Sequence, residues 1–232
     1  MFKYIFIIIV VSNIYSFSTE EKEVFFESFE FDIKKALNFI DDNILLIERV
    51  FNDYNIDHNL GLSIMFPELI RYNSLKDQIE ISINKMFYIN GGIESSDLSI
   101  GILQMKPSFI DRLSKSRKNN FYNDLFSYPD NFSNQDIRAL IIDRLQDTEY
   151  QLKYLSYFIS IIDNSNKIKF KNEYDKIKYY ATAYNAGAWY NQTNNEKLSK
   201  KKTYPYGPNN NEIKQYSYSD ISLYYYQDIL NK

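Results

Sequence analysis

The chain has 232 residues, 44% of them hydrophobic, so it can form one large domain or two small ones around a sizeable core. Its net charge of -3 argues against a general nucleic-acid-binding protein. The absence of cysteine excludes disulfides, thiolate metal sites and a cysteine nucleophile. The single histidine, His58, cannot form a histidine metal cluster, and its polar surroundings indicate a surface or capping residue.

Residues 1–18 have the pattern of a secretory signal peptide. Lys3 supplies a positive charge, Ile5 to Val11 form an unbroken apolar run, and serines follow near a cleavage site. The run is shorter than the roughly 20 residues that span a bilayer. We therefore expect a periplasmic or secreted protein with no stable membrane span after cleavage. A buried N-terminal strand is the alternative interpretation of this segment.

Residues 19–55 predict helices without a chemical motif. Apolar residues recur at steps of three or four up to Ile40, a break falls at residues 41–43, and a second apolar stripe continues to Phe51. We expect an N-terminal helical extension that packs against one domain covering residues 56–232.

The next predicted helix places a carboxylate inside an apolar run. Asp57 or Asn59 can cap this helix, and Glu68 lies directly after Pro67, where the helix starts a new turn or kinks. A buried carboxylate is costly unless it is paired or protonated, and burial raises its pKa toward that of a general acid. The alternative is a solvent-facing glutamate paired with an arginine, and the two candidates are Arg71 and Arg49.

A second chemical stretch follows an amphipathic helix predicted over residues 75–88. Residues 99–107 read Ser-Ile-Gly-Ile-Leu-Gln-Met-Lys-Pro. Gly101 lies between apolar neighbours and suggests a close backbone approach, as a substrate groove requires. Gln104 must be hydrogen-bonded if it is buried, although a solvent-facing amide is the alternative. Pro107 is expected in the first turn of a helix, and at most a short hairpin precedes it, between residues 90 and 99.

Two contrasting segments come next. Residues 115–135 are polar and asparagine-rich and predict an irregular excursion on the surface. Residues 136–162 carry an almost unbroken apolar stripe and predict the longest helix, which we expect to be the central scaffold.

Residues 176–188 predict the last core helix, which contains Ala-Tyr-Asn-Ala-Gly at residues 183–187. Gly187 is placed to end the helix, and Tyr184 and Asn185 would project from that end. Core packing is the alternative role of Tyr184, because the chain contains 22 tyrosines. Residues 192–211 are loop-like and basic, and residues 212–230 return to a helical pattern.

Three of these stretches together resemble the active-site motifs of the lytic transglycosylases, the lysozyme-like enzymes that cut peptidoglycan. Glu68 matches the family's glutamate in an apolar helix, residues 99–107 match its Ser-x-Gly-Leu-Met-Gln-x-x-Pro motif, and residues 183–187 match its Ala-Tyr-Asn-Ala-Gly motif. The resemblance covers roughly residues 56–187 and implies an all-α, lysozyme-like fold. Leu69 stands where the family often has serine, and the segment between the first two motifs is longer than usual.

The resemblance implies cleavage of the β-1,4 bond between MurNAc and GlcNAc in peptidoglycan glycan strands, without a metal or cofactor. Glu68 would protonate the glycosidic oxygen while the substrate's N-acetyl group stabilises the cation. The same residue would then take the proton of the 6-hydroxyl and close a 1,6-anhydro ring. Tyr184 and Asn185 would hold the N-acetyl group. The complete set of expected substrate-binding residues is Ser99, Gly101, Gln104, Tyr184 and Asn185.

Two other functions stay open. Asp97 is close in sequence to Ser99, so it could be a second carboxylate that activates water. That arrangement would give a hydrolytic, goose-type lysozyme-like muramidase. The other function is a non-catalytic wall-binding protein on the same fold, which an exposed Glu68 on the wrong face would favour.

Overall fold

The computed structural model describes residues 18–72, 82, 85–116, 120–165, 168–187, 191–205 and 214–230. Helices make up 72% of the structure, which confirms the expected all-α fold class. The predicted signal peptide lies outside the described residues, except for Ser18, and so does most of the helix predicted over residues 75–88. In the part of the chain described, no helix has the length and apolar character needed to cross a membrane.

The N-terminal extension consists of α1 (Thr19–Asp42) and α2 (Ile44–Asp53). Ser18 begins α1 with a capping box, in which its hydroxyl accepts a 3.1 Å hydrogen bond from the Glu21 amide. Apolar residues spaced for one helical face turn inward, so that α1 packs against α3 (His58–Arg71) and α2 packs against α7 (Thr148–Asp163). The extension thus shares the core of the rest of the chain.

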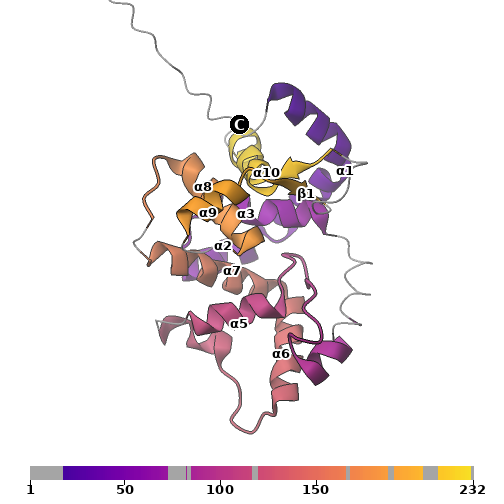
Figure 1. Cartoon of the computed structure of the whole chain (residues 1–232), viewed down its shortest axis with the longest axis vertical. Helices are drawn as coiled ribbons and strands as arrows, with labels where there is room; N and C mark the ends of the chain where they lie inside the picture. Colours follow the sequence, from indigo (N-terminus) through magenta and orange to yellow (C-terminus); the bar gives the residue numbers. More distant parts are fainter. Residues whose placement is uncertain are drawn as a thin grey trace, which may run out of the picture.

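Helix α3 lies at the centre of the molecule, with α1, α8 (Glu173–Ala186) and α10 (Tyr218–Tyr224) packed around it (Figure 1). Every residue from position 60 to 70 is buried, as expected for a helix enclosed on all sides. The Asp57 carboxylate caps its start by accepting a 2.8 Å hydrogen bond from the Leu60 amide. Pro67 lies inside α3, which continues without interruption to Arg71.

The prediction of one long helix over residues 136–162 is wrong, because the chain forms two helices there. Helix α6 (Asn134–Gln146) ends at Asp147, which has an extended backbone and caps α7 by accepting a 2.9 Å hydrogen bond from the Tyr150 amide. The apolar stripe continues across this break, so the stripe alone does not reveal it. An aspartate side chain that bonds to the backbone locally competes with helix continuation.

The segment that precedes α6 also differs from expectation. Instead of an irregular surface excursion, it contains the 3-10 helix η1 (Asn120–Phe126). Tyr122, Leu125 and Phe126 are buried there against α7. Aromatic side chains therefore anchor this polar segment to the core.

The C-terminal third is more irregular than the helix predicted there. Helix α9 (Gln192–Leu198) and strand β1 (Lys202–Tyr204) occupy the segment expected to be a loop. Strand β2 (Tyr216–Ser217) pairs antiparallel with β1, then α10 and the π-helical turn η2 (Tyr225–Leu230) follow. Residues 90–99, for which we expect at most a short hairpin, contain no strand, and an isolated bridge joins Ile100 to Met105 just after them.

Candidate active site

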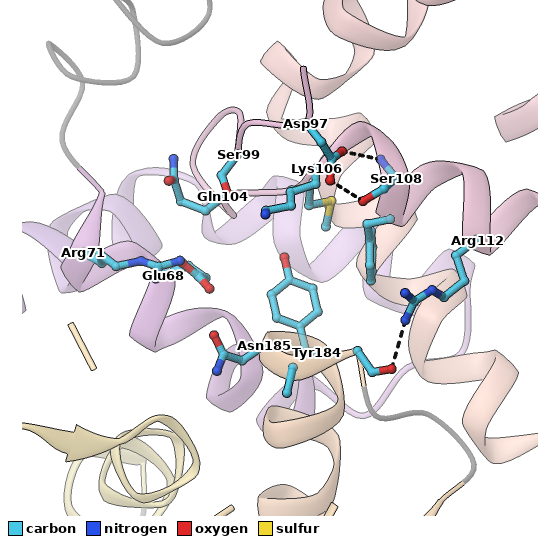
Figure 2. Close-up of a pocket in the computed structure, with 14 residues that line it drawn as sticks. Glu68, Arg71, Asp97, Ser99, Gln104, Lys106, Ser108, Arg112, Tyr184 and Asn185 are labelled. Carbon is cyan, nitrogen blue, oxygen red and sulfur yellow. Dashed lines mark hydrogen bonds and ion pairs between the residues drawn. The ribbon is translucent and has the colours of Figure 1, made fainter. Parts of the chain in front are cut away.

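A cavity with a volume of about 540 Å³ lies between α3, the loop of residues 97–106, α5 (Pro107–Lys115) and the end of α8 (Figure 2). The cavity brings together residues from all three sequence motifs. The predicted site residues that line it are Glu68, Ser99, Gln104, Tyr184 and Asn185. Gly101 is buried outside the lining.

Glu68 faces this cavity from the last turns of α3. The residue is only 2% exposed, because α3 is enclosed by neighbouring helices. One turn further along, the Arg71 guanidinium lies 2.5 Å from the Glu68 carboxylate, and Figure 2 shows the two side chains meeting at one wall of the cavity. The solvent-facing glutamate considered above is therefore wrong, whereas its pairing with Arg71 is correct.

Two opposing effects set the pKa of Glu68. Burial raises the pKa because it disfavours the charged carboxylate, while the positive charge of Arg71 and hydrogen bonds from Arg71 and Tyr218 lower it. Burial dominates, so the pKa of Glu68 is raised above the ordinary glutamate value. The negative charge of Glu68 in turn raises the pKa of Arg71. The site thus supports both protonation states of one carboxyl group.

Two tyrosines from the C-terminal segment complete the surroundings of Glu68, and the sequence analysis missed both. The single proton of the Tyr218 hydroxyl is shared between two acceptors, the Ile64 carbonyl oxygen at 3.1 Å and the Glu68 carboxylate. The Tyr204 hydroxyl donates a 2.9 Å hydrogen bond to the Pro67 carbonyl oxygen. Nothing distinguishes these two residues by sequence among 22 tyrosines, and only the fold brings them to α3.

The second motif forms a tight loop that is closed by backbone hydrogen bonds between Ile100 and Met105. Gln151, buried in α7, holds this loop from below. Its Oε1 accepts a 2.8 Å hydrogen bond from the Leu103 amide, and its Nε2 donates to the carbonyl oxygens of Ile100, at 2.6 Å, and Leu145, at 2.7 Å. The sequence analysis did not single out Gln151, because this residue lies beside the apolar stripe and belongs to none of the three motifs.

Gly101 is buried and packs against the interior of the protein. Its φ of 73° favours glycine, and a Cβ atom there would collide with the Gln151 side chain and the Leu145 carbonyl oxygen. The predicted close approach is therefore correct, and the approaching groups are Gln151 of α7 and the Leu145 carbonyl oxygen of α6. Gly101 does not line the cavity, so its expected role in the substrate groove stays a prediction.

Gln104 has a backbone conformation that non-glycine residues rarely adopt, with a φ of 50°. Such a conformation costs about 1–3 kcal/mol and persists only where the surroundings enforce it. The side-chain amide of Gln104 donates a 2.9 Å hydrogen bond from its Nε2 to the Gly101 carbonyl oxygen, and the side chain lines the cavity. The strained backbone fixes the direction in which this amide points.

Tyr184 and Asn185 end α8, where Gly187 adopts the left-handed conformation and caps the helix as predicted. The Tyr184 hydroxyl donates a 2.7 Å hydrogen bond to the Leu103 carbonyl oxygen, so this residue ties α8 to the second motif. Burial, followed by the charge of Glu68, raises the pKa of Tyr184 well above its ordinary value, and the hydroxyl keeps its proton. Its oxygen can still accept a hydrogen bond from a ligand.

Asn185 and Asp97 both line the cavity, but only Asp97 has its side chain held by hydrogen bonds to Ser108. Asn185 is exposed at the cavity, and Figure 2 shows its amide on the side where Glu68 and Arg71 meet. Both Asp97 carboxylate oxygens accept hydrogen bonds from Ser108, one from the amide at 2.8 Å and one from the hydroxyl at 2.7 Å. Asp97 therefore caps the first turn of α5.

A second cavity, with a volume of about 570 Å³, lies beside the start of α8 and contains none of the predicted site residues. The residues described include no group of three or more His, Cys, Asp or Glu side chains arranged to hold a metal ion.

No protein-family model, curated protein or solved structure matches the chain. The assignment of function accordingly relies on the first cavity and on the sequence motifs that meet there.

Proposed function

We propose that this protein is a lytic transglycosylase that cleaves the MurNAc-GlcNAc β-1,4 bond of peptidoglycan with a 1,6-anhydro product. One observation carries the proposal. The buried carboxyl group of Glu68, with its raised pKa, faces the same cavity as side chains of the other two motifs, which lie far away in sequence. This combination provides a general acid beside polar groups that can orient a sugar.

The two forces on Glu68 suit the two halves of this reaction. Burial favours the protonated form, which donates its proton to the glycosidic oxygen as the bond to C1 breaks. The carboxylate that forms is then stabilised by Arg71. In the second half, the substrate's 6-hydroxyl attacks C1 and returns its proton to Glu68, so the residue ends the cycle protonated.

The substrate's own N-acetyl group would bridge these two steps. Its carbonyl oxygen bonds to C1 as the leaving group departs, and that bond breaks when the 6-hydroxyl attacks. The acetamido N–H can donate to the Tyr184 oxygen, whose own proton is used by Leu103. The Asn185 amide, exposed at the same wall, can fix the acetamido group from the other side.

The geometry of Asp97 favours transglycosylation over hydrolysis. A hydrolase of the goose-type lysozyme class would need a second carboxylate that is free to activate water. Both Asp97 oxygens are instead engaged by Ser108. The non-catalytic alternative is disfavoured because Glu68 is buried facing the cavity.

The proposed substrate lies outside the cytoplasm, so the proposal includes export through a signal peptide at residues 1–18. N-terminal sequencing of the mature protein should give a start near residues 17–20. An intact Met1 on a protein recovered from the cytoplasm would contradict export.

The activity itself is tested by digestion of purified peptidoglycan and mass spectrometry of the released muropeptides. A transglycosylase releases muropeptides with 1,6-anhydro ends, which contain one water molecule less than reducing ends. Release of reducing ends would instead identify a hydrolase. No release above the level of the Glu68→Gln protein would leave only a binding role.

A further inference from the structure

Lys106 is a cation inside the cavity that the proposed reaction does not use. Figure 2 shows its side chain extending into the cavity between Gln104 and Tyr184. Within the part of the chain that the structure describes, no hydrogen bond or ion pair engages its exposed ammonium group. A charged donor that faces a cavity in this way is suited to an acceptor supplied by a ligand.

The charges that line the cavity favour an anionic ligand. Three cations, Arg71, Lys106 and Arg112, face two acids, Glu68 and Asp97, so the lining has a net charge of +1 when both acids are ionised. Protonation of Glu68, which the first step requires, makes the balance more positive. The whole chain carries -3, so this local excess of positive charge stands out against an acidic protein.

The three cations differ in the contacts that they make with the protein, and Lys106 makes the fewest. Arg71 is paired with Glu68, and Arg112 donates a 2.9 Å hydrogen bond to the Gly187 carbonyl oxygen. We infer that Lys106 binds a carboxylate of the substrate, carried by the lactyl substituent of the muramoyl sugar or by the stem peptide attached to it. The inference rests on the proposed function and adds a specificity residue to it.

The contact would separate peptidoglycan from chitin. Both polymers present β-1,4-linked N-acetylated sugars, but chitin is uncharged and has no carboxylate. A neutral strand in the cavity would displace water from the Lys106 ammonium without replacing the lost hydrogen bonds, which is unfavourable. A carboxylate would form a charge-assisted hydrogen bond with the same group.

Calorimetric binding to the Glu68→Gln protein tests the inference, because this background does not consume its ligands. Three ligands are compared: chitotetraose, the peptide-free tetrasaccharide of alternating GlcNAc and MurNAc, and the same tetrasaccharide with stem peptides. Adding Lys106→Gln should lower the affinity for carboxylate-bearing ligands about tenfold, the size of a partly exposed charge-assisted hydrogen bond. The affinity for chitotetraose should not fall, because this ligand has no carboxylate and the variant removes the desolvation cost of the ammonium group.

Two further variants control for charge. Lys106→Arg should keep most of the affinity, because it keeps a cationic donor at this position. Lys197→Gln removes the same charge from an exposed lysine on α9, outside the cavity, and should leave all three affinities unchanged. A loss in Lys197→Gln as large as in Lys106→Gln would show a general charge effect and overturn the inference.

The ligands also identify the carboxylate. If the peptide-free tetrasaccharide depends on Lys106, the lactyl carboxylate is bound, and if only the peptide-bearing ligand depends on it, the stem peptide supplies the group. Equal losses for chitotetraose and the muramoyl ligands, or no loss for any of them, would overturn the inference while leaving the proposed function intact. If the Glu68→Gln protein binds none of the three, the proposed function fails and the inference with it.

Discussion

The Arg71 guanidinium and the Glu68 carboxylate lie 2.5 Å apart, one turn from each other on the central helix α3. Burial pushes the carboxyl group toward its protonated form, and the neighbouring cation pulls it toward the ionised form. A residue held between these two influences can donate and accept a proton within one reaction cycle.

Glu68→Gln should abolish most of the cleavage of peptidoglycan. The amide keeps the size of the side chain but cannot donate a proton to the leaving oxygen or accept one from the 6-hydroxyl. General acid–base catalysis is commonly worth about 10²–10⁴-fold, and one group performs both transfers here, so we expect a loss at the upper end of that range. Rates of muropeptide release measure the effect. Cleavage at the original rate would exclude Glu68 as the acid.

Tyr218→Phe should move the pH dependence of the activity. The hydrogen bond from Tyr218 lowers the pKa of Glu68, so its loss raises that pKa, and the alkaline limb of the kcat/KM profile should shift to higher pH. Tyr204→Phe is the matched control, because its hydroxyl bonds to the Pro67 carbonyl oxygen on the same helix and its electrostatic effect falls on Arg71. Identical profiles for the two variants would contradict the assigned role of Tyr218.

Asp97→Asn distinguishes transglycosylation from hydrolysis. Asparagine can still accept the hydrogen bond from the Ser108 amide, so the cost in stability should stay below about 1 kcal/mol. We expect most of the activity to remain and the products to keep their anhydro ends. Loss of activity, together with reducing ends from the unmodified enzyme, would identify Asp97 as a base that activates water.

The buried carboxyl group should also make the stability of the protein depend on pH. Because the folded-state pKa of Glu68 is raised, the folded protein holds this proton where the unfolded chain has released it. The free energy of unfolding should therefore fall as the pH rises from the ordinary glutamate pKa through the raised value. Glu68→Gln lacks this dependence, so the Tm difference between this variant and the unmodified protein should shift in favour of the variant as the pH rises above the ordinary glutamate pKa. Arg71 stays charged throughout and contributes no slope.

Gln151→Leu should loosen the loop of the second motif. Three hydrogen bonds to backbone groups are lost together, and each buried group left unsatisfied costs about 1–3 kcal/mol. We expect a lower Tm and faster amide hydrogen exchange at Leu103. Ser156→Ala is the control, because it removes a buried hydroxyl whose 2.9 Å bond to Leu152 stays within α7. Equal exchange at Leu103 in both variants would show that Gln151 does not hold the loop.

Local signals in the sequence predicted much of this architecture. The Asp57 cap, the helix start at Pro107 and the glycine cap at Gly187 all lie where expected, because each depends on the chemistry of a few adjacent residues. The expected meeting of Glu68 with the other two motifs also agrees with the lining of the cavity. The roles assigned to these side chains stay predictions.

The remaining features depend on contacts that no local pattern reveals. The break at Asp147 interrupts an apolar stripe that continues on both sides, so periodicity could not reveal it. Gly101 has the predicted crowding, but only the fold shows that Gln151 is the group that crowds it. Tyr218 reaches α3 from a distant segment, and a tyrosine-rich chain offers no means of singling it out.

The C-terminal tyrosines also set an order in time. Tyr204 and Pro67 are 137 positions apart in the sequence, and Tyr218 and Ile64 are 154 apart. During synthesis, the helix that carries Glu68 therefore leaves the ribosome long before the residues that cover it. Helix α10 packs against α3, so a chain that ended after the third motif would lack part of the burial that raises the pKa of Glu68. The raised pKa that the proposed general acid needs would thus be complete only once the last segment has folded onto α3.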